Sequence, residues 1–584
     1  MERNGSLKES RVSSVSELLR IKSYFKKGSG LVYLFVVMVL VLSLPSYGSV
    51  GVQRQAVSQT FKLTSAERKL VDAVARGEGV SFMTGDPARD DPAHGSSWSE
   101  GRTLRAKVIK DLVTGANWAT KVRSAGVVIF GARIVGRLDF NNAHLQFPLK
   151  LEHCLLIEPI VLYGARSESI SLAGSYIAGT IKGLQIAFPE ERISVWAQGV
   201  RVDGNLILNS GFSGKGKVDL VQARIGGILD CNSSTIANPG GYAIDASLAQ
   251  IGDGVSLANL KAKGSISFAE AKIGGNLLAK GATIDNHDGV AFTAERAKIG
   301  GDVWLNSDFT ANGKVSLEGA EIAGNLDCGK GNFRAGRDGS ALDLLQAKIA
   351  GALSLWDVVI DGDLALAYAH VGVLLDNSDS WPLPGTLKLD GFVYGEIAPT
   401  APTDADSRIK WLGLQGTEVF RSQPYEQLAK VLRANGDDAG AKKVFIAKEN
   451  SVSRLASLGI FQRAWNCVLF LTIGYGYYPW RAVWFIGGFV GLGAVLFRGG
   501  YKKGLMIPAE EGAIAQWLPF NSIVFSLETF LPLVELRQAR HWTPAAQKGL
   551  SGRMLRVYLW VHIMLGWFFA SMLVAGITGL VRGG

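Results

Sequence analysis

The chain has 584 residues, which is too long for one compact domain at roughly 150 residues per domain, so several units or one elongated repeat array is expected. Glycine is abundant at 71 residues while proline is scarce at 17, and 47% of the residues are apolar, which excludes bulk disorder. The net charge of +10 could suggest nucleic acid, but the basic residues cluster beside apolar runs, so a membrane surface explains them better. The four cysteines lie far apart without a Cys-x-x-Cys pair, which argues against a disulfide scaffold or a zinc site.

Residues 1–50 read as a basic cytoplasmic tail followed by a targeting segment. The apolar run from Leu31 to Leu44 follows Lys26 and Lys27 and precedes small residues at Ser46 and Gly48. Fourteen residues is short for a membrane span, so a cleaved signal peptide and an uncleaved anchor both stay open, with a buried core helix as a third alternative. The positive-inside rule would export the chain that follows.

Residues 51–124 are predicted to form a small helical cap. Thr64-x-x-Glu67 fits a capping box that opens one helix, and the segment from Thr103 to Leu112 reads as another. Such a cap would cover the unpaired strand edges at the end of a stacked sheet.

Residues 125–400 carry an internal repeat, which is the strongest signal in the chain. The pattern Ala-x-Ile-x-Gly recurs, as in Ala223 to Gly227, and glycines mark a unit of about 49 residues that contains several short strands. Short strands with small and branched inward residues predict a parallel β-helix of about eleven turns, rather than a propeller or a sandwich. Cys231 and Cys328 fall in the same slot four turns apart, beyond disulfide reach, and all four cysteines are expected to be buried apolar residues.

Residues 401–457 are predicted to be a helical connector. Apolar positions recur at helical spacing on both sides of a Gly436-Asp437-Asp438 turn, between Pro424 and Asn450. A helical hairpin would join the repeat to the segment that follows.

Residues 458–584 are predicted to be an α-helical membrane domain. The segments from Trp480 to Phe497 and from Tyr558 to Leu580 are long and apolar enough to cross a bilayer, and their small residues would let them pack on each other. Basic residues in the intervening loop favour a cytoplasmic loop and an exported repeat.

Three groups of residues are candidates for chemistry. Asp86, Asp90 and Asp91 could ligate a divalent cation, although a solvated loop is the alternative. The string Thr472-Ile473-Gly474-Tyr475-Gly476 matches a potassium-channel filter, but the polar and charged chain before Ala464 favours an interfacial helix followed by an aromatic turn.

Glu528 and His562 are ionisable residues in apolar stretches, which makes them functional candidates. For Glu528 the sequence favours a re-entrant or surface helix that turns the carboxylate to water. No Gly-x-Gly-x-x-Gly motif fits a nucleotide-binding unit, so no cofactor is expected from the residues.

Several segments together resemble a known bacterial family. They are Leu63 to Arg68, Gly85-Asp86-Pro87 with Asp90-Asp91-Pro92, Arg102-Thr103 and Val108-Ile109, the Gly-Gly repeats, Pro424 to Leu428, Gly474 to Tyr477 with Pro479 and Arg481, and Leu531 to Val534. The chain is similar over residues 63–581 to an uncharacterised family with pentapeptide-like repeats whose members are often labelled "membrane-associated oxidoreductase". The resemblance implies redox activity but no particular catalytic residue.

The sequence therefore predicts a multi-pass protein of the bacterial inner membrane whose exported β-helix is a scaffold or binding surface of the envelope. The expected partners are the lipid bilayer and a protein on the β-helix surface, without nucleic acid and without evident catalysis. A membrane channel or transport accessory, built on the C-terminal helices, and an oxidoreductase are the alternatives.

Overall fold

The computed structural model describes residues 62–115, 122–123, 125–179, 192–416, 420–455, 459–509, 519–531 and 533–578. The chain divides into two units, Met1–Lys62 and Leu63–Gly584, and the fold given below is that of the second. The basic tail and the apolar run predicted in residues 1–50 lie outside the described residues.

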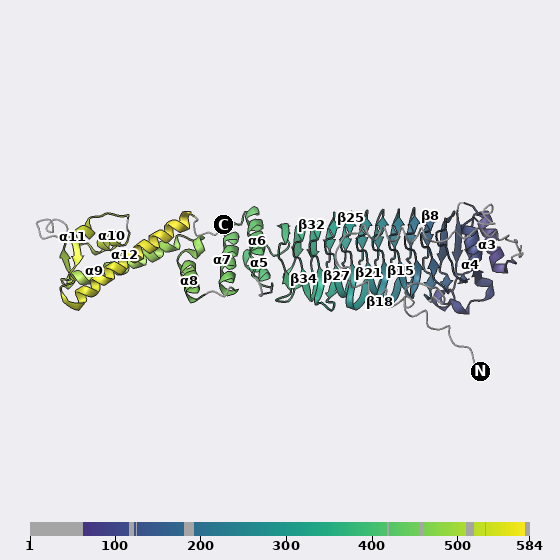
Figure 1. The fold of residues 1–584 in the computed structure, drawn as a ribbon, viewed down its shortest axis with the longest axis horizontal. Coiled ribbons are helices and arrows are strands. Elements are labelled where there is room, and N and C mark those ends of the chain that lie inside the picture. The colour runs from purple at the N-terminus through teal and green to yellow at the C-terminus, as the bar shows by residue number, and fades with distance from the viewer. Residues whose placement is uncertain are drawn as a thin grey trace, which may run out of the picture. The chain divides into compact units, whose positions relative to one another are not determined.

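Residues between Val80 and Ile397 form a parallel β-solenoid of about 11 turns. In the described part of the chain its strands make two long sheets, of 20 and 17 strands, which run as two rows in Figure 1. The first sheet contains β1 (Val80–Ser81), β3 (Val127–Phe130), β5 (Leu149–Glu152), β8 (Arg166–Ser167), β9 (Ile170–Ser171), β12 (Arg201–Val202), β13 (Leu206–Ile207), β16 (Arg224–Ile225), β17 (Leu229–Asp230), β19 (Gln250–Ile251), β20 (Val255–Ser256), β22 (Lys272–Ile273), β23 (Leu277–Leu278), β25 (Lys298–Ile299), β26 (Val303–Trp304), β28 (Glu321–Ile322), β29 (Leu326–Asp327), β32 (Lys348–Leu355), β35 (His370–Asp376) and β37 (Val393–Ile397). The second contains β2 (Thr103–Arg105), β4 (Arg133–Val135), β6 (Leu155–Leu156), β7 (Ile160–Val161), β10 (Tyr176–Ile177), β11 (Ile193–Trp196), β14 (Ser213–Gly214), β15 (Lys217–Asp219), β18 (Thr235–Asp245), β21 (Lys261–Ser267), β24 (Thr283–Thr293), β27 (Thr310–Ser316), β30 (Asn332–Arg334), β31 (Ser340–Asp343), β33 (Val359–Asp361), β34 (Asp363–Ala365) and β36 (Leu387–Lys388).

The strand register explains the repeat of about 49 residues. From Arg224 to His370 the paired residues of successive turns are Arg224, Gln250, Lys272, Lys298, Glu321, Lys348 and His370. Long turns alternate with short ones along this series, and one of each makes a unit. The longer turns carry extra residues inside β18 and β24, where the register with the next strand shifts.

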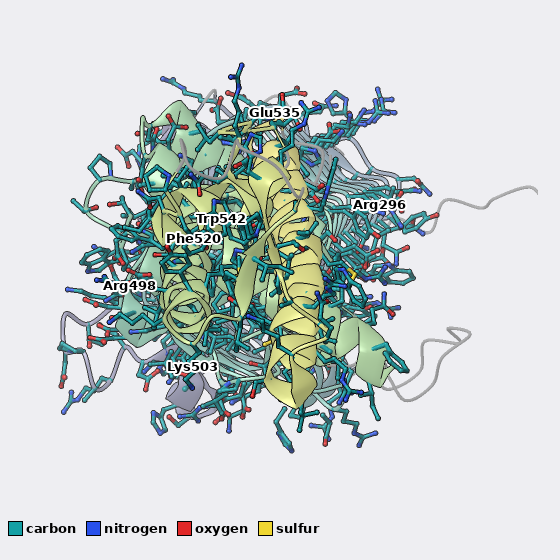
Figure 2. All side chains as sticks on the ribbon, turned by 90° about the vertical axis from the view of Figure 1, so that its left-hand side faces the viewer. Arg296, Arg498, Lys503, Phe520, Glu535 and Trp542 are labelled. Atoms are coloured by element: carbon teal, nitrogen blue, oxygen red, sulfur yellow. The ribbon has the colours of Figure 1, made fainter. Side chains whose placement is uncertain are left out.

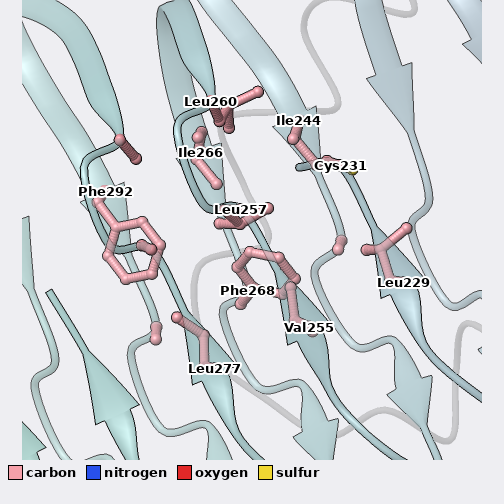
Figure 3. Close-up of a cluster of buried hydrophobic side chains, with 14 of the residues drawn as sticks. Leu229, Cys231, Ile244, Val255, Leu257, Leu260, Ile266, Phe268, Leu277 and Phe292 are labelled. Atoms are coloured by element: carbon pink, nitrogen blue, oxygen red, sulfur yellow. The ribbon is translucent and has the colours of Figure 1, made fainter. Parts of the chain in front are cut away.

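The interior of the solenoid is filled by stacks of apolar side chains. Leu229, Val255 and Leu277 occupy paired positions in consecutive turns, and Ile244 stacks in the same way on Ile266 (Figure 3). Each of these side chains is almost fully buried. The inward position of every short strand therefore builds one continuous core, as the alternating pattern of the sequence predicts.

The N-terminal cap combines helices and strands. The predicted capping box is present, since Thr64 and Glu67 bond each other's backbone at the start of α3 (Ser65–Arg76). The second predicted helix, α4 (Ala106–Val113), begins later than expected because residues 103–105 form β2. Strands β1 and β2 pair with β3 and β4, so both sheets begin inside the cap. Two short 3₁₀ helices, η1 (Pro92–Ser97) and η2 (Glu100–Arg102), complete the cap.

The C-terminal end of the coil is covered by α5 (Ala405–Leu412), after the short 3₁₀ helix η4 (Ser378–Ser380). The guanidinium of Arg408 is fully buried and donates to both carboxylate oxygens of Asp376, at 2.9 and 2.6 Å. Trp381 Nε1 donates to the same carboxylate at 2.9 Å, and Arg408 Nε donates to the carbonyl of Pro402 at 2.6 Å. This buried network ties α5 to β35.

The predicted helical hairpin is formed by α6 (Gln423–Ala434) and α7 (Asp438–Leu455). Gln427 Nε2 donates to the carbonyl of Tyr394 in β37 at 2.6 Å, which joins the hairpin to the coil. One hydrophobic core includes residues from Ala66 to Val444, so cap, coil and hairpin pack as a continuous body.

The last helices form a separate packed group. It contains α8 (Ile460–Ile473), the 3₁₀ helix η5 (Gly474–Gly476), α9 (Arg481–Lys502), α10 (Ser522–Phe530), α11 (Gln538–His541) and α12 (Gly549–Thr578), with the strand pair β38 (Met506–Pro508) and β39 (Trp542–Pro544). Phe485 stacks on Phe569, whereas Gly500 lies against Leu555, so α9 and α12 run antiparallel in contact. Both helices are long and apolar enough to cross a membrane, by length and composition. At the far end of this pair Phe520 packs against Trp542, with ring centroids 5.3 Å apart (Figure 2).

Candidate functional site

An open groove runs along the first sheet of the solenoid, and we call it the basic groove. It is lined by residues in or next to β12, β16, β19, β22, β25, β28, β32, β35 and β37. It has a volume of about 1270 Å³ and extends from Arg201 to Val393. The outward residues that form its first row are Arg201, Arg224, Gln250, Lys272, Lys298, Glu321, Lys348 and His370. From Arg201 to Val393 the groove comprises eight successive strand pairings, or about 38 Å at a spacing of about 4.8 Å.

The groove follows from the repeated triplet of a long polar residue, isoleucine and glycine. In a strand the first and third residues face outward, and the isoleucine between them is buried, as Ile273 is at 2% exposure. The third residue is glycine in the turns from Gly226 to Gly300, so a trough lies beside the row of long side chains.

Close stacking of the turns explains the glycines. A Cβ at Gly252 would lie 2.0 Å from the carbonyl oxygen of Gly226, and one at Gly274 would lie 1.9 Å from that of Gly252. No side chain fits these distances without a backbone shift. Ala323 and Ala350 stand at the equivalent places further along, so the later turns accommodate a methyl group there.

A row of asparagine and aspartate residues follows the glycines. The side-chain oxygens of Asn276, Asp302 and Asn325 accept hydrogen bonds from backbone N–H groups of the next turn, at 2.7 to 2.8 Å. Asn205 accepts from Ile228 in the same way at 3.0 Å. We call these asparagine and aspartate residues the second row. Their hydrogen bonds link each turn to the next.

The charges of the first row are only partly compensated within the chain. Glu321 lies 3.0 Å from Lys298 Nζ and 3.4 Å from Lys348 Nζ, and the two lysines lower the pKa of the Glu321 carboxyl. By contrast, Arg201, Arg224 and Lys272 make no ion pair or side-chain hydrogen bond with any residue that the structure describes. Their side chains are exposed in the groove.

Like charges are stacked directly on one another in this row. Arg201 pairs in register with Arg166 on one side and with Arg224 on the other, and Lys272 pairs with Lys298. Like charges opposite one another on neighbouring strands destabilise a sheet. The arrangement therefore costs folding stability, which favours a role in binding an anion.

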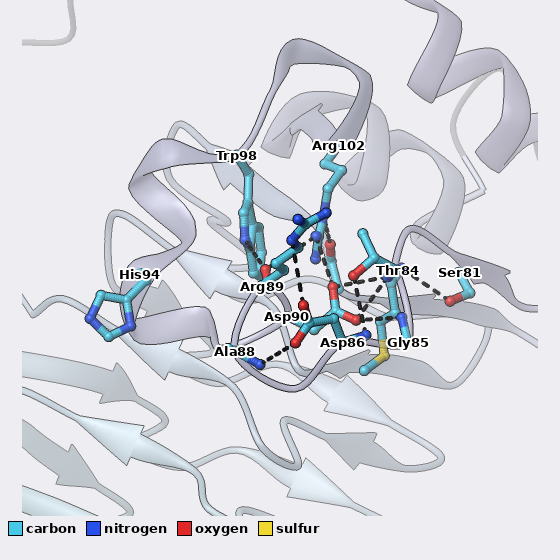
Figure 4. A network of polar contacts seen from close by, with 12 residues as sticks. Ser81, Thr84, Gly85, Asp86, Ala88, Arg89, Asp90, His94, Trp98 and Arg102 are labelled. Carbon is cyan, nitrogen blue, oxygen red and sulfur yellow. Dashed lines mark hydrogen bonds and ion pairs between the residues drawn. The ribbon is translucent and has the colours of Figure 1, made fainter.

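The three aspartates predicted as metal ligands bind groups of the cap itself, and Figure 4 shows two of them, Asp86 and Asp90. Asp90 accepts from the backbone of Thr84 and Gly85 at 2.8 Å and from Arg102 Nη1 at 2.9 Å. Asp86 accepts from the Ala88 N–H, and Asp91 caps η1. Among the described residues no group of three or more His, Cys, Asp or Glu side chains could hold a metal ion, so these aspartates find no support as a metal site.

The hydrogen bonds to Asp90 also set its acidity. Burial alone would raise the pKa of Asp90, but the donors from Thr84, Gly85 and Arg102 together lower it below its ordinary value. Arg102 stacks over the Trp98 ring at 3.8 Å, and Trp98 Nε1 donates to the Arg89 carbonyl. These contacts give the loop a structural role, because they hold together the segments of the cap that carry Thr84, Asp90 and Arg102.

The string predicted as a possible filter is a tight turn between α8 and α9. Gly474 and Tyr475 have positive φ angles of 55° and 54°, and both residues are buried. The carbonyls of Ile473 and Gly474 accept from Tyr478 and Tyr477 within the turn at 3.0 Å. Tyr475 Oη lies 3.3 Å from Asn450 Oδ1, and Thr472 donates to Val468 O. This geometry favours the predicted helix and aromatic turn, with η5 over Gly474–Gly476, over an extended filter.

Glu528 differs from its prediction, because it is buried and not turned to water. Its Oε2 accepts from the backbone N–H of Gln538 at 2.6 Å and of Ala539 at 2.9 Å, at the start of α11. Phe520 packs beside Tyr501 and Phe530 beside Phe489, so α10 runs back along α9. The Glu528 carboxylate then links α10 to the start of α11 by these hydrogen bonds.

His562 lies at the contact of three helices and is fully buried. Its Nε2 is 3.1 Å from the Ser526 carbonyl and 3.2 Å from Ser526 Oγ, while Tyr558 Oη is 3.3 Å from its Nδ1. A Cβ at Gly493 would lie 2.3 Å from Ser526 Oγ. His562 is therefore satisfied by its neighbours, and Glu528 and His562 are held by different partners.

The cysteines match their prediction with one exception. Cys154, Cys231 and Cys328 are free and buried, and burial raises the pKa of Cys154 to about 12. Cys467 is exposed on α8, so the prediction of a buried residue was wrong there. The repeat geometry that buries Cys231 and Cys328 does not extend to α8, which leaves most of its side chains exposed.

The groove itself was missed by the sequence reading. The charged residue before each isoleucine, as in Ala-Lys272-Ile and Ala-Lys298-Ile, was visible in the repeat and could have signalled a row of cations.

Comparison with protein families, curated proteins and solved structures finds no match to this chain. The resemblance to the family labelled "membrane-associated oxidoreductase", and the redox activity that it implies, stay predictions.

Proposed function

We propose that this protein is a membrane-anchored binding scaffold of the bacterial envelope. The observation that carries the proposal is the basic groove, a surface about 38 Å long on a solenoid whose chain also contains two long apolar helices. A stacked solenoid offers a rigid and extended binding surface, which suits display at a membrane.

Anchoring is supported by the exposure of apolar side chains on α9 and α12. Trp484 is 74% exposed, Val495 69% and Leu550 70%, and only 22% of the most apolar window of either helix is buried. An apolar surface of this kind in water promotes aggregation, whereas lipid tails would cover it.

We further propose that the helices lie in the inner membrane with the solenoid on the exported side. Arg498 and Lys502 lie toward the end of α9, Lys503 follows it, and Arg553 lies near the start of α12, at the loop end of the pair. The positive-inside rule would keep that end in the cytoplasm. A protein partner on the solenoid surface stays a prediction.

Membrane association can be tested with the full chain and two matched variants. Carbonate extraction should leave the protein in the membrane pellet. Leu492→Lys places a charge near the middle of α9, at a residue that is 48% exposed, and should lower the pelleted fraction, since a central charge costs about 3 kcal/mol. Val359→Lys, at an exposed residue of β33, should leave the pelleted fraction unchanged.

Release of the unaltered protein by carbonate, or equal behaviour of the two variants, would refute the anchor. Sidedness has a separate readout in spheroplasts. External protease should cut the solenoid while the loop between α9 and α12 stays protected; the reverse pattern would overturn the exported orientation.

A further inference from the structure

We infer that the basic groove binds a linear acidic polysaccharide, such as a polymer of uronic acid units. This inference rests on the proposed function and names the ligand class of the same surface. It is carried by the spacing of the unpaired cations, the shape of the trough and the absence of Phe, Tyr and Trp from its described lining.

The spacing of the cations suits a chain with one carboxylate per sugar. Adjacent turns place Arg201 and Arg224 one strand spacing apart, at about 4.8 Å, and Lys272 two spacings beyond Arg224. Each ring of an extended pyranose chain advances by nearly one such spacing. Neighbouring rings of an extended two-fold chain face opposite ways, so every second carboxylate would meet the row, about two strand spacings apart, as Arg224 and Lys272 are. Arginine can bind a carboxylate by two parallel hydrogen bonds.

The trough and its second row suit a hydroxylated ring. The glycines from Gly226 to Gly300 let a ligand approach the backbone closely. Gln250 offers both donor and acceptor atoms in the first row, between two cationic positions. Asn276 and Asn325, two residues after Gly274 and Ala323 of the trough, are exposed.

Two other extended ligands fit less well. A single-stranded nucleic acid is normally held by aromatic side chains on which the bases stack, but the described lining of the groove contains no Phe, Tyr or Trp. An extended peptide rises about 3.3 Å per residue, which falls out of step with rows about 4.8 Å apart. Uncompensated cations at the spacing of the sugar units favour the polysaccharide.

Binding of polygalacturonate to the full-length protein in detergent or nanodiscs tests the inference directly. Polygalacturonate should bind with an affinity that falls as salt is added, whereas neutral dextran should not bind. The triple variant Arg201→Glu, Arg224→Glu and Lys272→Glu should bind about 30-fold more weakly, since three exposed ion pairs are lost. The matched control Lys261→Glu, Lys263→Glu and Lys280→Glu changes the same net charge at exposed residues outside the groove and should keep the affinity.

Circular dichroism and thermal unfolding establish that both triple variants fold, so a loss of affinity reports the groove. Equal loss in the two triple variants would refute the inference, as would equal binding of dextran. Tighter binding of an oligothymidylate than of polygalacturonate would assign the groove to nucleic acid instead. Failure of polygalacturonate to bind, in a protein that resists carbonate extraction, would overturn the ligand class and leave the anchored scaffold standing.

Discussion

The buried pair of Arg408 and Asp376 gives the sharpest test of how the coil is closed. Replacing Arg408 by methionine keeps much of the side-chain volume but leaves the Asp376 carboxylate with Trp381 as its remaining side-chain donor. Both side chains of the ion pair are almost completely buried. Breaking such a pair on one side costs about 3–5 kcal/mol, because a buried charge loses its partner.

The loss should be local, and amide hydrogen exchange of α5 and of the end of β35 measures it. In Arg408→Met these amides should exchange faster by a factor of about 100 or more, while the middle of the solenoid keeps its protection. Arg421→Met is the matched control, because Arg421 pairs with Asp390 at 3.1 Å on an exposed surface and should contribute at most about 1 kcal/mol. Equal protection of α5 in the Arg408→Met variant and the unaltered protein would refute this account of the closure.

Three further outcomes follow from the cap, the helix pair and the cysteines. Because the pKa of Asp90 is lowered in the folded cap, the ionised carboxylate stabilises the cap above about pH 4, and this stabilisation is lost as the pH falls through the folded pKa. Limited proteolysis should therefore cut the cap loop more readily in acid, and Asp90→Asn should weaken this pH dependence. Gly566→Val should destabilise the helix group by about 1–3 kcal/mol, since a Cβ there would clash with the carbonyl of Phe530 in α10. Gly487→Val, where a Cβ meets no neighbour, should not, and thermal unfolding in detergent measures both variants. A maleimide should label Cys467 in the folded protein but not buried thiols such as Cys154, and all four cysteines after unfolding.

Each of these outcomes can fail in a distinct way. Proteolysis of the cap loop that does not change between neutral and acid pH would contradict the role of Asp90. Equal melting of the two glycine variants would show that α10 does not approach α12 as closely as described. Labelling of Cys154 at the rate of Cys467 would mean that the coil opens around its first turns.

The solenoid was predictable because each turn repeats the same local rule. Inward isoleucine and leucine at period 2, with glycine where two backbones approach, specify a stacked coil without any long-range information. The buried slots of Cys231 and Cys328 follow from the same register. The start of the coil was less visible, because Thr103–Arg105 precedes a helix directly and reads as part of it, although it pairs with β4.

Function-related features were harder to read because they depend on contacts between distant residues. Glu528 was predicted to face water, yet the returning chain supplies two N–H donors that no local pattern reveals. The groove depends on stacking: a lysine at one position of the repeat is ordinary, and only the parallel register places Arg201 and Arg224 side by side. The sequence therefore carries the components of the groove, while the pairing of turns creates it.

The alternation of long and short turns suggests how such a surface could change its reach over evolutionary time. A tandem duplication of one repeat unit would insert two turns without disturbing the pairing on either side, because incoming and outgoing strands keep their register. Each copy would add about 10 Å of length and two more sites to the row. The number of repeat units would then set the length of the groove, and relatives with fewer or more units should bind proportionally shorter or longer stretches of the ligand.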